Sequence, residues 1–180
     1  MAAGYSGTPL GKKLGVKDGQ RTWAYAMPES VAAEIAECGF RPLELKTPKA
    51  GLEMVHLFVT RREDLARQLG RVRGLIEQDG MVWVSWPKKA AKVETDVNED
   101  VVRAEAFPLG LVDVKVCAVD EVWSGLKLVI RVSERGRKRL ALALHPIAQG
   151  EGAMKIAAGV FSNRRLGFFR HILPPVMRFS

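Results

Sequence analysis

The segment Ser-Trp-Pro-Lys-Lys-Ala gathers several kinds of side chain that bind ligands. Ser85 can donate a hydrogen bond, and the ring of Trp86 can stack on a flat ligand. Lys88 and Lys89 are cationic, and Thr95 follows shortly before a predicted helix whose free N–H groups favour anions. These residues predict a site for a small anionic ligand. The structural alternative has Trp86 covering the edge of a sheet and both lysines in solvent.

A second candidate site lies in the segment Asp-Glu-Val-Trp-Ser-Gly, residues 120–125. Asp120, Trp123 and Ser124 offer a carboxylate, a flat ring and a hydroxyl to a ligand. A carboxylate with a raised pKa in a cleft would also suit acid–base catalysis. The simpler interpretation is a tight turn at Ser124 and Gly125, with Trp123 packed on the sheet.

Metal binding and nucleophilic catalysis have no clear signal. His56 lies between apolar neighbours, which favours a buried, hydrogen-bonded histidine over a general base, because no Ser or Cys is obviously aligned with it. The other histidines and the two cysteines, Cys38 and Cys117, are scattered and lack metal-ligand spacing. The sequence therefore predicts no metal, and it identifies no catalytic residue.

The elements that must position these side chains alternate between strand and helix. Strands are predicted at 20–27, 41–46, 52–60 and 79–86, helices at 28–38, 60–76 and 97–107, and an antiparallel hairpin at 110–132. Thr60 with Glu63 should cap the second helix, and Asp96 the third. This order predicts an α/β, three-layer, mostly parallel Rossmann-like sheet of the methyltransferase type, closed by an antiparallel C-terminal hairpin. Only residues 47–52 join the second and third strands, too few for a helical crossover, so the first half is abbreviated.

Four blocks along the chain carry a specific resemblance. They read YSGTPLGKKLGVKDGQ, VHLFVTRREDL, DGMVWVSWPKKAAKVETDVNEDVVR and GLVDVKVCAVDEVWSGLKLVIR. In this order they resemble the bacterial family catalogued as domain of unknown function 3052 (DUF3052), over about residues 4–132. The resemblance implies an abbreviated class I methyltransferase-like domain, and it implies no particular reaction.

The turn after the first strand, AYAMPES, has none of the glycines with which such folds bind a cofactor. Met27 and Pro28 would fill the approach of the ligand, and Glu29 adds a negative charge. Glu44 lies about where a ribose-binding acid could sit, but lone acids are common at strand ends. The segment GTPLGKK also fails as a phosphate loop, because it has three residues between its glycines and no hydroxyl residue after the lysine. No cofactor is therefore predicted.

The chain is basic because of its C-terminal segment. Of the net charge of +8, residues 133–180 hold +7, from nine Lys or Arg and two acids. We expect a Rossmann-like domain over residues 1–132 and a loosely structured basic extension over 133–180. The extension could bind nucleic acid or an anionic surface. We expect a cytoplasmic location, because there is no signal peptide and no apolar run long enough for a membrane span.

These observations favour a non-catalytic or regulatory ligand-binding module that keeps the scaffold without its cofactor. One alternative is a small enzyme or sensor for an anionic metabolite, including a divergent methyltransferase, acting through the Ser-Trp-Pro-Lys-Lys loop. Another is binding of nucleic acid or an anionic surface through the basic extension. The sequence does not predict the ligand or the oligomeric state.

Overall fold

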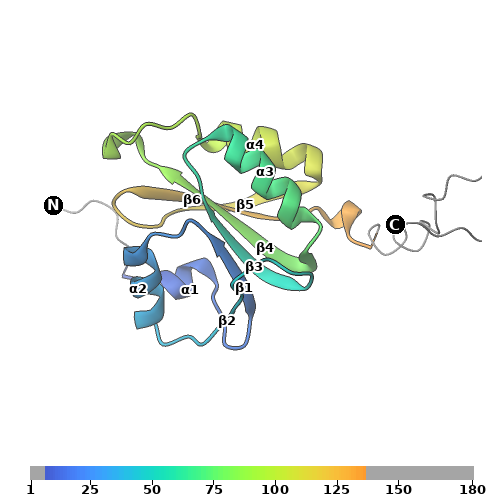
Figure 1. Ribbon diagram of the computed structural model, residues 1–180, viewed down its shortest axis with the longest axis horizontal. Helices are drawn as coiled ribbons and strands as arrows, with labels where there is room; N and C mark the ends of the chain where they lie inside the picture. The colour runs from blue at the N-terminus through green and yellow to red at the C-terminus, as the bar shows by residue number, and fades with distance from the viewer. Residues whose placement is uncertain (1–6, 137–180) are drawn as a thin grey trace, which may run out of the picture. The chain divides into compact units, whose positions relative to one another are not determined.

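A computed structural model describes residues 7–136, which form a six-stranded sheet with helices on both faces (Figure 1). The strands are β1 (Arg21–Tyr25), β2 (Leu43–Glu44), β3 (Leu52–Phe58), β4 (Ile76–Pro87), β5 (Leu111–Ala118) and β6 (Trp123–Ile130). Their order in the sheet is β2-β1-β3-β4-β6-β5. β1 to β4 are parallel, and β6 lies antiparallel between β4 and β5. The predicted fold class is confirmed: a mostly parallel Rossmann-like sheet with an antiparallel hairpin.

The helices cover the two faces of the sheet in pairs (Figure 1). They are α1 (Leu10–Leu14), α2 (Glu29–Glu37), α3 (Arg62–Arg73) and α4 (Glu99–Ala106), with short 3-10 turns η1 (Lys89–Ala91), η2 (Phe107–Leu109) and η3 (Val132–Glu134). α1 and α2 lie on one face, and α3 and α4 lie on the other. The sheet is thus the middle of three layers.

Each face of the sheet has its own hydrophobic core. Leu57 of β3 packs with Leu65 of α3 in one core. Phe58, the next residue, packs with Leu14 of α1 and Trp83 of β4 in the other. Successive residues of a strand point to opposite faces, so a strand between two helical layers must be apolar almost throughout. The prediction that this strand is buried on both faces is confirmed.

The first half of the domain is short, as the sequence predicts. Residues 45–51, between β2 and β3, contain no helix and no strand. The predicted hairpin is also present, with Ala118 of β5 paired to Ser124 of β6. Its second strand inserts next to β4, which leaves β5 at the edge of the sheet.

Two predicted helix caps are wrong. α3 begins at Arg62, beyond the expected cap Thr60, and Asp96 accepts a hydrogen bond from the Arg62 backbone N–H at 2.6 Å. Asp96 therefore caps the helix that precedes it in the chain. The side chain of Asn98 caps α4 instead, accepting from the Val101 N–H at 3.0 Å. The chain leaving β4 returns past the end of β3, which brings Asp96 to α3.

Hydrogen bonds continue past the domain boundary predicted at residue 132. The Gly136 N–H donates to Gln78 Oε1 at 2.9 Å. Residues 1–6 and 137–180 lie outside the described residues. They include most of the predicted basic extension, so the binding of nucleic acid or an anionic surface by this extension stays a prediction. The domain division stays a prediction.

Candidate functional site

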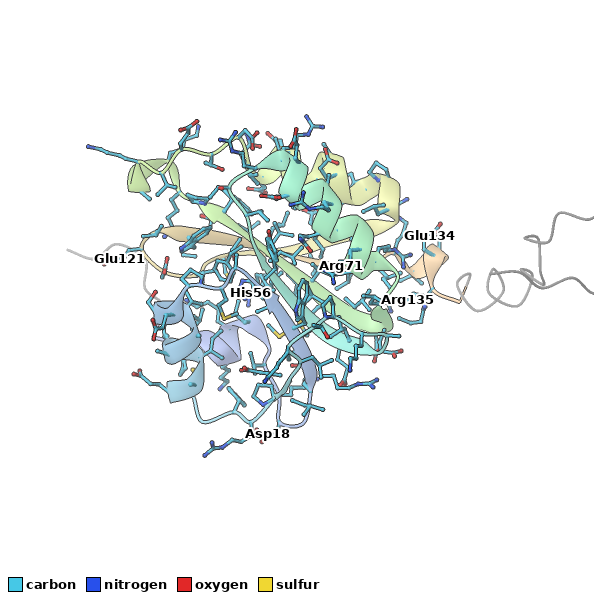
Figure 2. All side chains as sticks on the ribbon, viewed as in Figure 1. Asp18, His56, Arg71, Glu121, Glu134 and Arg135 are labelled. Atoms are coloured by element: carbon cyan, nitrogen blue, oxygen red, sulfur yellow. The ribbon has the colours of Figure 1, made fainter. Side chains whose placement is uncertain are left out.

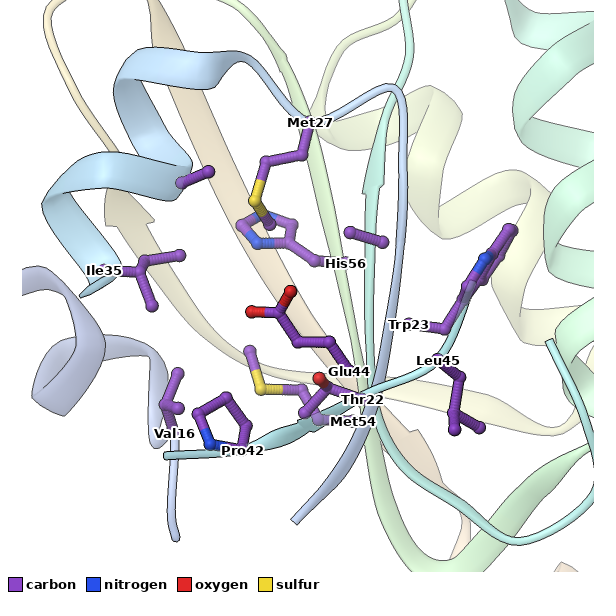
Figure 3. A pocket seen from close by; sticks show the side chains of 12 residues that line it. Val16, Thr22, Trp23, Met27, Ile35, Pro42, Glu44, Leu45, Met54 and His56 are labelled. Atoms are coloured by element: carbon purple, nitrogen blue, oxygen red, sulfur yellow. The ribbon is translucent and has the colours of Figure 1, made fainter. Parts of the chain in front are cut away.

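A cavity of about 230 Å³ lies between α2 and the sheet, over the end formed by β2, β1 and β3 (Figure 3). Ala32 and Ile35 contribute from α2, and Met54 contributes from β3. Met27, in the turn between β1 and α2, directs its side chain into the same space. Most of the lining is therefore apolar. Residues 45–51 between β2 and β3 carry no helix that could cover this end of the sheet.

Besides the hydroxyl of Thr22, two titratable side chains line the cavity. Glu44 of β2 projects its carboxylate into it, and His56 of β3 lies deeper, where only 2% of the residue is exposed (Figure 3). His56 packs on Phe58, with 4.3 Å between the ring centroids. Figure 2 places His56 near the middle of the domain, between the two helical layers. The cavity thus joins an exposed carboxylate to a buried imidazole.

His56 is hydrogen-bonded on one side of its ring. Its Nε2 lies 2.8 Å from the Oγ of Ser85, a fully buried residue of β4. Its Nδ1 is buried and has no hydrogen-bond partner. Burial lowers the pKa of His56 to about 3, so the ring is neutral at pH 7. The expected buried, hydrogen-bonded histidine is confirmed, but the expectation that no serine is aligned with it is wrong.

The His56–Ser85 pair is poorly suited to nucleophilic catalysis. A catalytic histidine accepts the serine proton most effectively when its pKa is near the working pH. It is also oriented by a third group on its other ring nitrogen, and the Nδ1 of His56 has none. Ser85 is 0% exposed, so a substrate could not reach its Oγ without movement of the sheet. The pair is better suited to fixing the orientation of the ring.

The turn between β1 and α2 has the predicted glycine-free character. Ala26 adopts a left-handed φ of 50°, a conformation that favours glycine, and Pro28 occupies the N-terminal cap of α2. Met27 fills the space next to this turn and belongs to the cavity wall. The prediction that no cofactor binds here in the usual mode rests on these residues and stays a prediction.

The residues of the Ser-Trp-Pro-Lys-Lys loop do not converge on one site. Ser85 faces His56, whereas Trp86 is 7% exposed and packs in the core under α3 and α4. Lys88 Nζ donates to the backbone carbonyl of Asp120 at 2.5 Å. Lys89 begins the exposed turn η1. The buried ring of Trp86 thus has no open face for stacking.

Thr95 and the hairpin candidates also have structural partners. The Oγ1 of Thr95 donates to the Thr60 carbonyl at 2.8 Å. Asp120 Oδ1 accepts from the N–H of Trp123 at 2.6 Å and from that of Val122 at 2.8 Å, which forms the turn. Ser124 lies in β6 and pairs with Ala118, so the turn predicted at Ser124 is wrong.

The ring of Trp123 packs edge-on against Phe58, with 5.1 Å between centroids. None of the candidate ligand-binding residues of the two loops lines the cavity, although Ser85 is hydrogen-bonded to His56, which does. Glu44 and Met27, considered above for a cofactor site, also line it. Ligand binding at either loop therefore stays a prediction.

A comparison of the two lysines tests the structural role of this loop. Lys88→Ala is expected to lower the free energy of unfolding by about 1–2 kcal/mol, because a half-buried, charge-assisted hydrogen bond is lost. Lys89→Ala, at the neighbouring exposed position, should stay within about 0.5 kcal/mol of the parent. Urea denaturation of both variants measures the difference. Equal stability of the two variants would contradict a structural role for Lys88.

Two other features of residues 7–136 bear on function. Within this range, no group of three or more His, Cys, Asp or Glu is placed to hold a metal ion. Within the same range, no helix has the length and apolar character of a membrane span. The cavity is therefore the feature on which we base a functional proposal.

Comparisons with known proteins concern the fold. Similar solved structures include a magnesium protoporphyrin IX methyltransferase from Synechocystis PCC 6803 with bound SAM, at 10% identity and a TM-score of 0.46, covering 67% of this chain and 74% of that one. A putative type 11 methyltransferase from Sulfolobus solfataricus matches at 15% identity and a TM-score of 0.43, covering 64% and 73%. At these values the likeness carries nothing about activity. No protein-family model and no curated protein matches the chain, so the DUF3052 resemblance stays a prediction.

Proposed function

We propose that the domain is a ligand-binding module, without catalytic activity, whose site is the cavity between α2 and the sheet. The observation that carries the proposal is the buried Nδ1 of His56, which has no partner and belongs to a residue that lines this cavity. An unpaired buried polar atom costs about 1–3 kcal/mol. A ligand that pairs with it recovers part of that free energy once the cavity wall shifts enough to expose the atom.

The volume of the cavity supports a small ligand. A dry apolar cavity of roughly 150 Å³ is large enough for benzene. At about 230 Å³, this cavity has room for one ring with a small substituent. The apolar lining from α2 and from the turn after β1 supports the burial of such a ring.

The alternatives have less support from the described residues. An enzyme or sensor for an anionic metabolite would use Ser85, Trp86 and the two lysines, which point to different surroundings. A divergent methyltransferase would need a methyl donor against Met27 and Pro28, where side chains occupy the turn. Nucleic-acid binding through the basic extension involves residues outside the described range.

A pair of α2 variants tests the proposal. A library of single-ring compounds is first titrated into the full chain, with thermal stability and amide NMR shifts as readouts. Compounds that bind should raise the melting temperature by mass action and shift the resonances of β1, β2 and α2. Ala32→Phe places a ring inside the cavity and should weaken binding at least tenfold.

Ala33→Phe is the matched control, because Ala33 is the next residue of α2, is exposed and does not line the cavity. It should bind the same compounds as the parent does. If Ala32→Phe binds them as tightly as Ala33→Phe, the cavity is not the site.

A further inference from the structure

The hydrogen atoms of the His56–Ser85 pair can be assigned by counting unsatisfied groups. If Ser85 O–H donates to Nε2, the only group left without a partner is the Nδ1–H. If Nε2–H donates to Ser85 instead, Nδ1 lacks a donor and the Ser85 hydroxyl hydrogen lacks an acceptor. Among residues 7–136 the only hydrogen bond of Ser85 Oγ is the one to His56. The first arrangement leaves one buried group unpaired and the second leaves two, so the first is favoured.

The assignment gives His56, a residue of the cavity lining, an unpaired N–H on its buried Nδ1. The ring is neutral, so it carries a single N–H, and this N–H is on Nδ1. Ser85 holds the other nitrogen in place and fixes the plane of the ring. A buried donor of this kind selects a ligand that presents an acceptor, because a ligand without one leaves the Nδ1–H unpaired.

Glu44 sets the charge of the same cavity. It is the charged residue of the lining, and the other lining residues are apolar or neutral. No ion pair to Glu44 is found within residues 7–136, so its negative charge is not offset by a cation there. This exposed carboxylate would repel an anionic ligand in the cavity, whereas it would attract a neutral donor or a cation.

We infer that the cavity selects a single-ring ligand without negative charge, which offers a carbonyl-type acceptor to the Nδ1–H of His56 and a donor to the carboxylate of Glu44. This inference rests on the proposed function and adds the class of ligand. It differs from the anionic metabolite that the lysines of the Ser-Trp-Pro-Lys-Lys loop suggest. A primary amide on an aromatic ring combines the two groups in one substituent.

Three compounds with the same ring separate the two contacts. Benzamide has an acceptor and a donor, benzylamine has a cationic donor without an acceptor, and benzoate has acceptors and a negative charge.

In titrations of the full chain, benzamide should bind at least tenfold more tightly than benzoate. In Glu44→Gln the difference should fall below threefold, because the repulsion of benzoate is removed. His56→Gln should weaken benzamide at least fivefold and leave benzylamine within twofold of its parent value.

A second measurement needs no variant. Nitrogen-15 NMR of labelled histidine should show His56 as a neutral ring protonated on Nδ1, with Nε2 as the acceptor. A ring protonated on Nε2 would overturn the inference, as would benzoate binding as tightly as benzamide.

The outcomes separate this inference from the proposed function. Suppose that benzamide does not bind, but that other compounds bind the parent and not the Ala32→Phe variant. The inferred ligand class is then wrong, and the cavity remains the site. If no compound of the library binds the chain at all, the proposed function fails, and this inference fails with it.

Discussion

Acidification from pH 7 to pH 4.5 is expected to lower the free energy of unfolding by about 2–3 kcal/mol through His56 alone. The pKa of His56 is about 3 in the folded protein and near 6.5 in the unfolded chain. Between these values the unfolded state binds the additional proton, so stability falls as the pH falls. The contribution of His56 to the free energy of unfolding is fully present above pH 6.5. It is lost progressively as the pH falls to about 3.

His56→Gln isolates this effect from the protonation of carboxylates. Both proteins carry the same acidic residues, including Glu44 in the same cavity, so their contributions cancel in the comparison. Urea denaturation at steps of half a pH unit should give a steeper loss of stability for the parent than for the variant. Parallel curves between pH 6.5 and 4.5, or an imidazole that titrates near 6.5 in the folded protein, would contradict the burial of His56 as a neutral ring.

Trp83→Ala is expected to lower the free energy of unfolding by about 3–5 kcal/mol. Trp83 is 0% exposed and lies in the core between the sheet and α1. Its Nε1–H donates to the carbonyl of Leu14, the last residue of α1, at 2.9 Å. The substitution therefore removes a large packed ring and also the hydrogen bond that ties α1 to β4. Val16, two residues beyond Leu14, lines the cavity, so ligand binding should weaken as well.

Two further variants apportion the effect of Trp83. Trp83→Phe keeps an apolar ring but leaves the Leu14 carbonyl without its donor, so about 1–3 kcal/mol of the loss should remain. Phe107→Ala, at a position that is 41% exposed, should cost clearly less than Trp83→Ala. Urea denaturation measures all three. A Trp83→Ala protein within 1 kcal/mol of the parent would show that α1 is not held by this residue.

The sequence predicts the sheet well because its signals are local. The apolar run of β3 indicates that this strand is buried on both faces. The short link of residues 45–51 indicates that no helical crossover joins β2 to β3. The hairpin of β5 and β6 follows from two runs of alternating side chains joined by a polar turn. Each of these inferences needs only residues that are neighbours in the chain.

The His56–Ser85 pair depends on strand register, which the sequence does not specify. Phe58 is paired with Ser85, and His56 with Trp83, so the histidine and the serine lie diagonally on one face of the sheet. A shift by one residue would place them on opposite faces. The sequence does show that His56 and Ser85 are polar residues within apolar strands. That these two side chains touch is seen only in the structure.

The scatter of the candidate residues has a simpler cause. Ser85 and Trp86 are consecutive in β4, so their side chains point to opposite faces and could not have shared a site. Lys88 and Asp120 meet because the end of β4 lies beside the start of the antiparallel strand β6, which becomes visible only with the strand order. The cavity itself forms where α2 crosses a sheet whose first half is abbreviated. No single segment of the sequence predicts this cavity.

A crystal structure of the full chain with benzamide, or with the tightest compound of the library, tests the central claim most directly. The ligand is expected between α2 and strands β1 to β3, with an acceptor within hydrogen-bond distance of His56 Nδ1 and a donor toward Glu44. Ligand density found only at the Ser-Trp-Pro-Lys-Lys loop, or outside the cavity against Pro28, would contradict it.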